Sequence, residues 1–70
     1  MERIQVESSN IDAITYDENS GLLEIEFKAG GAYEYSDVPM YVYDELMTAD
    51  SKGRYANQNI YKNYTPNKKG

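Results

Sequence analysis

The apolar residues of this chain change their spacing once, near residue 36, and that change limits the folds open to it. Before this point they alternate with polar residues, most clearly in the run LLEIEF at residues 22–27. Such alternation is typical of a half-buried β-strand. Afterwards Val38, Val42 and Leu46 follow at four-residue spacing, which is typical of the buried stripe of an amphipathic helix. Strands followed by helices predict an α+β domain and not a parallel α/β sheet.

Five elements follow from this pattern. The predicted strands span residues 11–16, 22–27 and 32–35, and the predicted helices span residues 38–49 and 52–61. Ser36 and Asp37 stand where a helix cap is expected, and Pro39 suits a first helical turn. We therefore predict a three-stranded antiparallel meander followed by two helices packed on one face (β-β-β-α-α). Residues 1–64 would form this single domain, and residues 65–70 a flexible basic tail.

Turn-forming residues predict the register of the strands. A four-residue loop after residue 17 is rich in turn formers and sets Tyr16 opposite Leu23. For the second hairpin we expect a three-residue loop that ends in a left-handed Gly31, which sets Ile25 opposite Tyr35. Both registers place aromatic and aliphatic side chains on the same apolar face.

Composition excludes several kinds of chemistry. The chain contains no cysteine and no histidine, which excludes disulfides, thiol catalysis, the Ser-His-Asp arrangement and the usual structural zinc sites. We therefore expect neither an enzyme nor a metal or cofactor site. No apolar run approaches the ~20 residues of a membrane span, and the first residues do not resemble a signal peptide. A cytoplasmic protein with no membrane contact is the expectation.

Charge is divided unevenly along the chain. All twelve Asp and Glu lie in the first 50 residues, opposed there only by Arg3 and Lys28. The last 20 residues hold the other five of the seven cations and no acid. Two interpretations stay open. The basic end offers a face to an anionic partner, or it pairs with the acidic sheet of its own chain.

The start of the second predicted helix is the candidate binding site. Cations beside free backbone N–H groups at a glycine-containing helix start can hold a phosphate, and neighbouring tyrosines can stack a base. Tyrosines in a sheet equally serve as core, so Tyr33 and Tyr35 are either a stacking surface or buried packing. The candidate ligand-binding residues are Lys52, Gly53, Arg54, Asn57, Tyr35 and Tyr55.

Short motifs distributed along the chain resemble one family. They include the segment at residues 8–11, the run at residues 23–27, the Tyr33-Glu34-Tyr35 centre and the Ser51-Lys52-Gly53 turn. In this order and spacing they resemble the KTSC domain, a short module found alone in bacterial proteins and at the C-terminus of some lysyl-tRNA synthetases. Through that attachment, the resemblance implies an RNA ligand.

Together these features predict a small non-catalytic binding module. Its ligand would be RNA, such as tRNA, or a nucleotide phosphate bound through the basic second helix. The alternative is a protein–protein interaction or subunit-assembly module with no nucleic-acid ligand, because tyrosine is common at interfaces. The sequence leaves the oligomeric state open.

Overall fold

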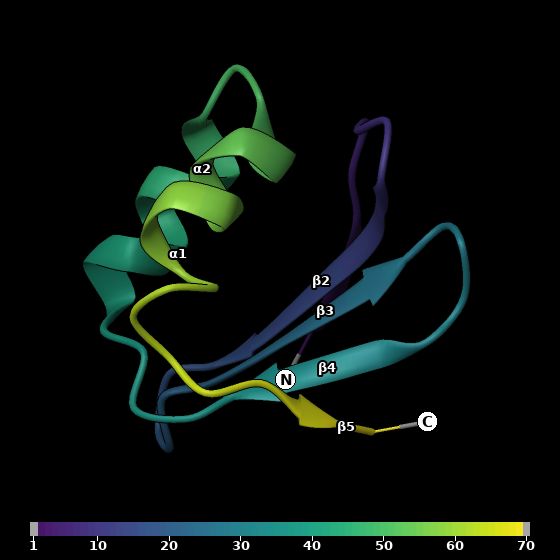
Figure 1. Ribbon diagram of the computed structural model, residues 1–70. Coiled ribbons are helices and arrows are strands. Elements are labelled where there is room, and N and C mark those ends of the chain that lie inside the picture. Colours follow the sequence, from purple (N-terminus) through teal and green to yellow (C-terminus); the bar gives the residue numbers. More distant parts are fainter. Residues whose placement is uncertain (1, 70) are drawn as a thin grey trace.

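The computed structural model describes residues 2–69 and has two layers, a sheet and a pair of helices that cover one face of it (Figure 1). The strands are β1 (Glu2–Gln5), β2 (Ile11–Asp17), β3 (Leu22–Phe27), β4 (Ala32–Tyr35) and β5 (Asn67–Lys68); the helices are α1 (Met40–Thr48) and α2 (Lys52–Asn59). The strand order is β1-β2-β3-β4-β5, antiparallel throughout. The α+β class is thus confirmed.

The sheet has five strands in the described part of the chain, so the prediction of a three-stranded meander is wrong. β1 pairs with β2, where Ile4 lies opposite Ile14. β5, which comes from the segment expected to be a tail, pairs with β4, and the N–H of Lys69 donates to the Ala32 carbonyl at 2.8 Å. Both added strands are short and held at the sheet edges by backbone hydrogen bonds, so they need no strong apolar alternation.

The β2–β3 hairpin has the predicted register, with Tyr16 opposite Leu23. Its turn packs against the segment that enters α1. The Val38 N–H donates to the Gly21 carbonyl at 2.9 Å, and the Tyr16 hydroxyl donates to the Val38 carbonyl at 2.6 Å. The Tyr16 and Tyr43 rings stack with centroids 4.7 Å apart. We call this region, formed by residues 16, 21, 38 and 43, the closed end.

The register predicted for the β3–β4 hairpin is wrong by two residues. Ile25 lies opposite Tyr33, not Tyr35. The turn explains the shift, because Gly30 and Gly31 both have positive φ, at 107° and 87°, and the loop begins one residue earlier than expected. A shift of two residues keeps every side chain on its predicted face.

The first helix is shorter than predicted. It begins at Met40 with Pro39 as its N-cap, and no side chain caps it. The predicted capping role of Ser36 and Asp37 is therefore wrong; Asp37 instead adopts a left-handed φ of 60° in the turn before the helix. Val38 lies outside the helix, yet its side chain is buried as expected.

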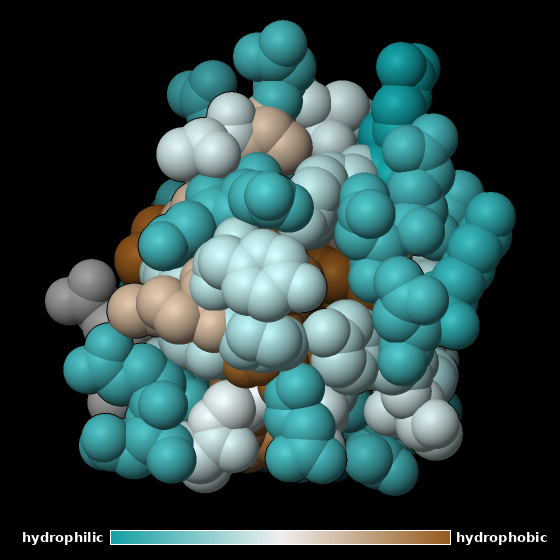
Figure 2. Space-filling view, turned by 90° about the vertical axis from the view of Figure 1, so that its left-hand side faces the viewer, coloured by the Kyte–Doolittle hydropathy of each residue, from teal (hydrophilic) through white to brown (hydrophobic). Residues whose placement is uncertain are grey.

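The core lies between the sheet and the helices. Its buried hydrophobic residues are Ile11, Ala13, Ile14, Leu23, Ile25, Tyr35, Val38, Val42, Leu46, Ala56 and Ile60. Tyr35 is only 1% exposed, so it is packing and not a surface for stacking. This burial raises the pKa of Tyr35 to about 12. Seen from the helical side, the surface is mostly hydrophilic, with small separate hydrophobic areas (Figure 2).

Candidate functional site

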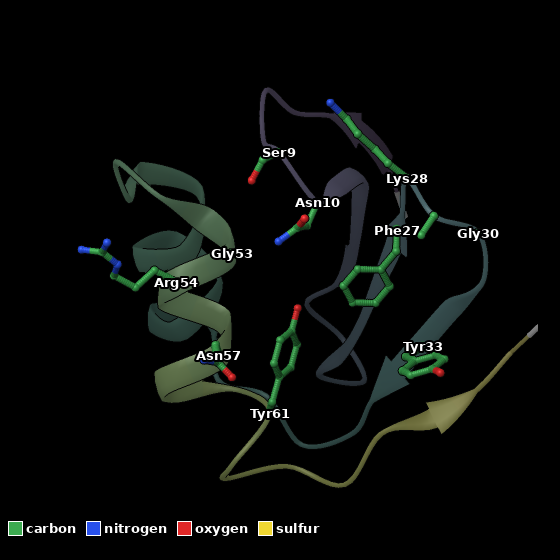
Figure 3. Close-up of a pocket in the computed structure, with 11 residues that line it drawn as sticks. Ser9, Asn10, Phe27, Lys28, Gly30, Tyr33, Gly53, Arg54, Asn57 and Tyr61 are labelled. Carbon is green, nitrogen blue, oxygen red and sulfur yellow. The ribbon is translucent and has the colours of Figure 1, made fainter.

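A groove of about 820 Å³ lies between α2 and the end of the sheet away from the closed end (Figure 3). Four parts of the chain contribute to it: the loop before β2, the end of β3 with the turn that follows, the start of β4, and α2 with the turn that follows it. Its lining residues are Ser9, Asn10, Phe27, Lys28, Ala29, Gly30, Tyr33, Gly53, Arg54, Asn57 and Tyr61. The volume is within the range of small-molecule sites, roughly 300–1,000 Å³.

The helical wall of the groove is a line of residues four apart. Gly53 and Asn57 are four residues apart in α2 and so share one face, and Tyr61 lines the groove from the turn after the helix. The adjacent positions Ala56 and Ile60 are fully buried and hold the helix on the core. Because core-facing and groove-facing positions lie side by side, packing of α2 also positions the groove wall.

The opposite wall includes Asn10, which is held by its backbone. The Ser8 hydroxyl accepts from the N–H groups of Asn10 and Ile11, both at 3.3 Å. The Asn10 carbonyl accepts from the Lys28 N–H at 2.8 Å, which ties the loop to the end of β3. With the backbone fixed in this way, the Asn10 side chain extends toward Gly53 across the groove (Figure 3).

Three aromatic rings form the interior. The Phe27 and Tyr33 rings meet edge to face with centroids 5.8 Å apart, and the Phe27 and Tyr61 centroids are 6.2 Å apart. Tyr61 also stacks on the buried Tyr35 at 5.9 Å, so a core residue supports its ring from behind. Burial raises the pKa of Tyr61. Its phenol therefore stays neutral at physiological pH and is available as a hydrogen-bond donor.

Positive charge lies at the rim of the groove and not in its interior. Lys28 and Arg54 line the groove, but both residues are exposed. The Arg54 side chain extends outward from α2, and the Lys28 side chain extends away from the aromatic rings (Figure 3). The arrangement suits a ligand with a planar or apolar part inside and a negative charge outside.

The structure brings together half of the residues predicted as a binding site. Gly53, Arg54 and Asn57 line one groove. The other three are not among its lining residues. The Lys52 ammonium turns back to the Ala49 carbonyl at 3.5 Å, the Tyr55 hydroxyl donates to Glu45 at 2.5 Å, and Tyr35 is in the core.

The start of α2 also differs from an open phosphate site. The Ser51 hydroxyl accepts from the Arg54 N–H at 3.3 Å, which occupies one of the backbone donors at the helix start. Phosphate capture there by Lys52 and the helix N-terminus is not the arrangement that the geometry favours. The groove beside the helix is the better candidate.

Sequence reasoning missed the sheet-side half of the groove. Asn10, Lys28 and Phe27 are adjacent to turns, where their residue types are ordinary. Tyr61 was placed only as the end of the second helix. No local pattern of residue types marks the sheet-side positions, because strand pairing brings them to the groove.

The acidic outer face of the sheet is neutralised in part by its own chain. Lys69 contacts Glu24 at 2.7 Å and Glu34 at 3.5 Å, and Arg3 contacts Glu26 at 2.7 Å. The hydrogen bond to Glu24 raises the pKa of Lys69. One cation of the basic end therefore pairs with the acidic sheet, as one of the two interpretations predicted, while α2 does not.

Residues 2–69 contain neither a candidate membrane span nor a cluster of metal-binding side chains. No helix there is long and apolar enough to cross a membrane. Among the same residues, no three or more Asp, Glu, His or Cys side chains are grouped to hold a metal ion.

The fold and the groove define a class, a small α+β module in which two helices cover one sheet face and leave one end open. A model of the KTSC domain matches residues 7–64, and the chain belongs to this family. A crystal structure of a KTSC domain protein from Yersinia pestis superposes with a TM-score of 0.94 at 38% identity, covering 99% of this chain and 97% of that one.

Relatives occur alone and as parts of larger proteins. An uncharacterized protein of Stutzerimonas stutzeri is 41% identical over 58 residues, covering 83% of this chain and 82% of that protein. A lysine–tRNA ligase of Nostoc sp. is 42% identical over 52 residues, which cover 74% of this chain but 9% of the ligase. The resemblance to the KTSC domain is thus confirmed.

Proposed function

We propose that this protein is a non-catalytic recognition module that binds single-stranded RNA in the groove between α2 and the sheet. The observation that carries the proposal is the distribution of chemistry in the groove. Its interior offers the aromatic rings of Phe27 and Tyr61 and the amide of Asn10, whereas Arg54 and Lys28 lie at the rim. An unpaired nucleotide has the same distribution, with a planar base at one end and a negative phosphate at the other.

The charge of the remaining surface favours a short single strand over a long duplex. The protein has a net charge of −5, and within residues 2–69 the three glutamates of its outer sheet face share only two cations, Arg3 and Lys69. A long polyanion would be repelled by this face. A strand that enters the groove locally meets the two rim cations first. Relatives of this segment lie in lysine–tRNA ligases, whose name refers to an RNA. With such a ligand, a cytoplasmic location stays our proposal.

Salt-dependent titration tests the proposal. Short single-stranded RNA is added to the protein, and the amide NMR spectrum is recorded at several salt concentrations. We expect the amide signals of Asn10, Gly53 and Tyr61 to shift. The affinity should fall as salt rises, and the slope of its logarithm against the logarithm of the salt concentration should increase with the number of phosphates contacted. The charge reversals Lys28→Glu and Arg54→Glu together should weaken binding and flatten the salt dependence.

The matched control is Lys62→Glu, because Lys62 is exposed and does not line the groove. It changes the net charge without changing the rim, so it should weaken binding much less than reversal of the two rim cations. Absence of binding at low salt, or equal losses in all charge variants, would show that the groove is not an RNA site.

A protein-interaction function is the second candidate. It is favoured by two exposed apolar residues at the start of α1, Met40 at 45% and Tyr41 at 64% exposure. The hydrophobic areas on this side are small and separate (Figure 2), which is less than a stable interface usually offers. Replacing both residues with serine should leave RNA binding unchanged. A loss of self-association on this replacement, measured by sedimentation, would favour the second candidate.

A further inference from the structure

Gly53 is an unexpected residue for its position. It is the second residue of α2, in the first helical turn, where glycine has a lower helix propensity than alanine. The helix does not need it for conformation, because its φ lies outside the left-handed region. Packing does not need it either. A Cβ at this position would come no closer than 3.8 Å to any atom considered, namely the Asn10 side-chain nitrogen, which is an ordinary contact.

The groove explains what the helix does not. Without a side chain, Gly53 lets the Asn10 amide nitrogen lie 3.8 Å from the position of a Cβ, and both residues line the groove with Tyr61 (Figure 3). A side chain longer than a methyl group would extend from this wall into the groove. Glycine is used where a ligand approaches a backbone closely. On this view, glycine makes α2 less stable but leaves room for a flat ligand beside the helix.

We propose that the groove holds one unpaired nucleobase, bordered by Gly53 and Asn10 on one side and by the rings of Phe27 and Tyr61 on the other. This inference rests on the proposed RNA-binding function and names the part of the RNA that enters. A base suits the site because its faces are apolar and its edges carry donors and acceptors. The side-chain amides of Asn10 and Asn57 each offer both, so they match a base edge. The described lining residues supply no cation to the interior, and phosphate stays at the rim.

The first test uses the unaltered protein and changes only the ligand. Short single-stranded RNA is compared with an oligomer of the same length and charge that lacks its bases. Stacking of a base on aromatic side chains contributes about 1–3 kcal/mol, so removal of the bases should weaken binding by at least about fivefold. Equal affinity for the two oligomers would overturn base insertion and leave RNA binding through the backbone intact.

The second test fills the groove. Leucine is a strong helix former, so Gly53→Leu should not weaken α2, while its side chain occupies the space beside Asn10. We expect this variant to bind RNA at least about tenfold more weakly and to lose its preference for the intact oligomer. The matched control is Gln58→Leu, which adds the same side chain to an exposed position of α2 outside the groove. It should bind as the wild type does.

The outcomes separate this inference from the function on which it rests. RNA binding that is equal in Gly53→Leu and Gln58→Leu would overturn the base site alone. If the wild type binds neither RNA nor free nucleoside monophosphates, both proposals are overturned. Binding of free nucleoside monophosphates, abolished by Gly53→Leu and without any RNA binding, would uphold the base site and overturn RNA as its source.

Discussion

The two ends of the sheet are built on the same plan but closed to different degrees. At the closed end, Gly21 has a φ of 72°, and a Cβ there would lie 3.4 Å from the backbone of Val38. At the groove end, a Cβ on Gly53 would have only an ordinary contact at 3.8 Å. The first glycine is required by the fold, whereas the second is not. A glycine that neither conformation nor packing explains therefore marks the end where a ligand is expected.

The comparison also concerns how the helices are attached. At the closed end, Tyr16 and Gly21 bind the backbone of Val38 directly. At the groove end, the ring of Tyr61 in the turn after α2 contacts Phe27, while Ala56 and Ile60 are buried in the core. Backbone hydrogen bonds fix the spacing of the two layers, while ring contacts leave room beside them. The four predictions below test this difference, from the largest effect to the smallest.

Leu46→Ala should destabilise both ends of the sheet, because it truncates a side chain of the core that they share. Leu46 is fully buried, and truncation of a buried leucine costs roughly 2–5 kcal/mol. A domain of this size holds only about 3–5 kcal/mol in total, so the variant should be largely unfolded at room temperature by circular dichroism. Leu46→Met keeps the volume and should cost less than about 1.5 kcal/mol. A cooperative wild-type melt of Leu46→Ala would contradict its central place.

Gly21→Ala should damage the closed end selectively. The left-handed conformation costs a residue with a Cβ roughly 1–2 kcal/mol, and contact with the Val38 backbone adds to this. Urea unfolding should show the loss, and hydrogen exchange at the Val38 amide should become faster. Ser20→Ala, in the same exposed turn, is the control and should be close to neutral. Unchanged stability of Gly21→Ala would show that the closed end is not tightly constrained.

Tyr16→Phe should weaken the same end by removing one hydrogen bond. The Tyr16 hydroxyl donates to the Val38 carbonyl, and such a bond contributes about 0.5–1.5 kcal/mol. Burial raises the pKa of Tyr16, so the fold favours the protonated phenol. The contribution is therefore fully present below the ordinary tyrosine pKa of about 10 and is lost as pH rises through the raised value.

The difference in unfolding free energy between wild type and Tyr16→Phe should consequently shrink in alkaline solution. Urea titrations at neutral pH and above about pH 10 measure it. Tyr41→Phe serves as the control, because Tyr41 is 64% exposed and should show no such convergence. A difference that stays constant with pH would mean that the Tyr16 phenol is not held by the fold.

The sequence predicted the parts of the fold that depend on apolar pattern. The strands 22–27 and 32–35 and the buried stripe through Val42 and Leu46 follow from periodicity and agree with the structure. It could not predict β1 and β5, which are short edge strands held mainly by backbone pairing. The shift of the β3–β4 hairpin has a similar cause, because Gly30 and Gly31 both permit the positive φ that ends the loop.

Only the helical half of the groove was predictable. Gly53, Arg54 and Asn57 lie close together in the sequence, so a single local pattern was enough to predict all three. Asn10 and Phe27 reach the groove through the register of β2 and β3 and through the hydrogen bond between the Asn10 carbonyl and the Lys28 N–H. These are long-range relations, and no local pattern of residues specifies them.

Gly53→Ala should have the smallest effect on stability and the opposite sign to Gly21→Ala. The added methyl group meets the Asn10 side chain at an ordinary distance, and alanine at this second position of α2 is favoured over glycine by at most roughly 0.5–1 kcal/mol. Urea unfolding should therefore show a gain of that size. Gln58→Ala, at an exposed site on α2, controls for helix propensity without the groove. A loss of stability in Gly53→Ala would mean that the fold itself requires glycine at this position. There would then be no reason to explain Gly53 by a ligand, because the fold would require the glycine at both ends of the sheet.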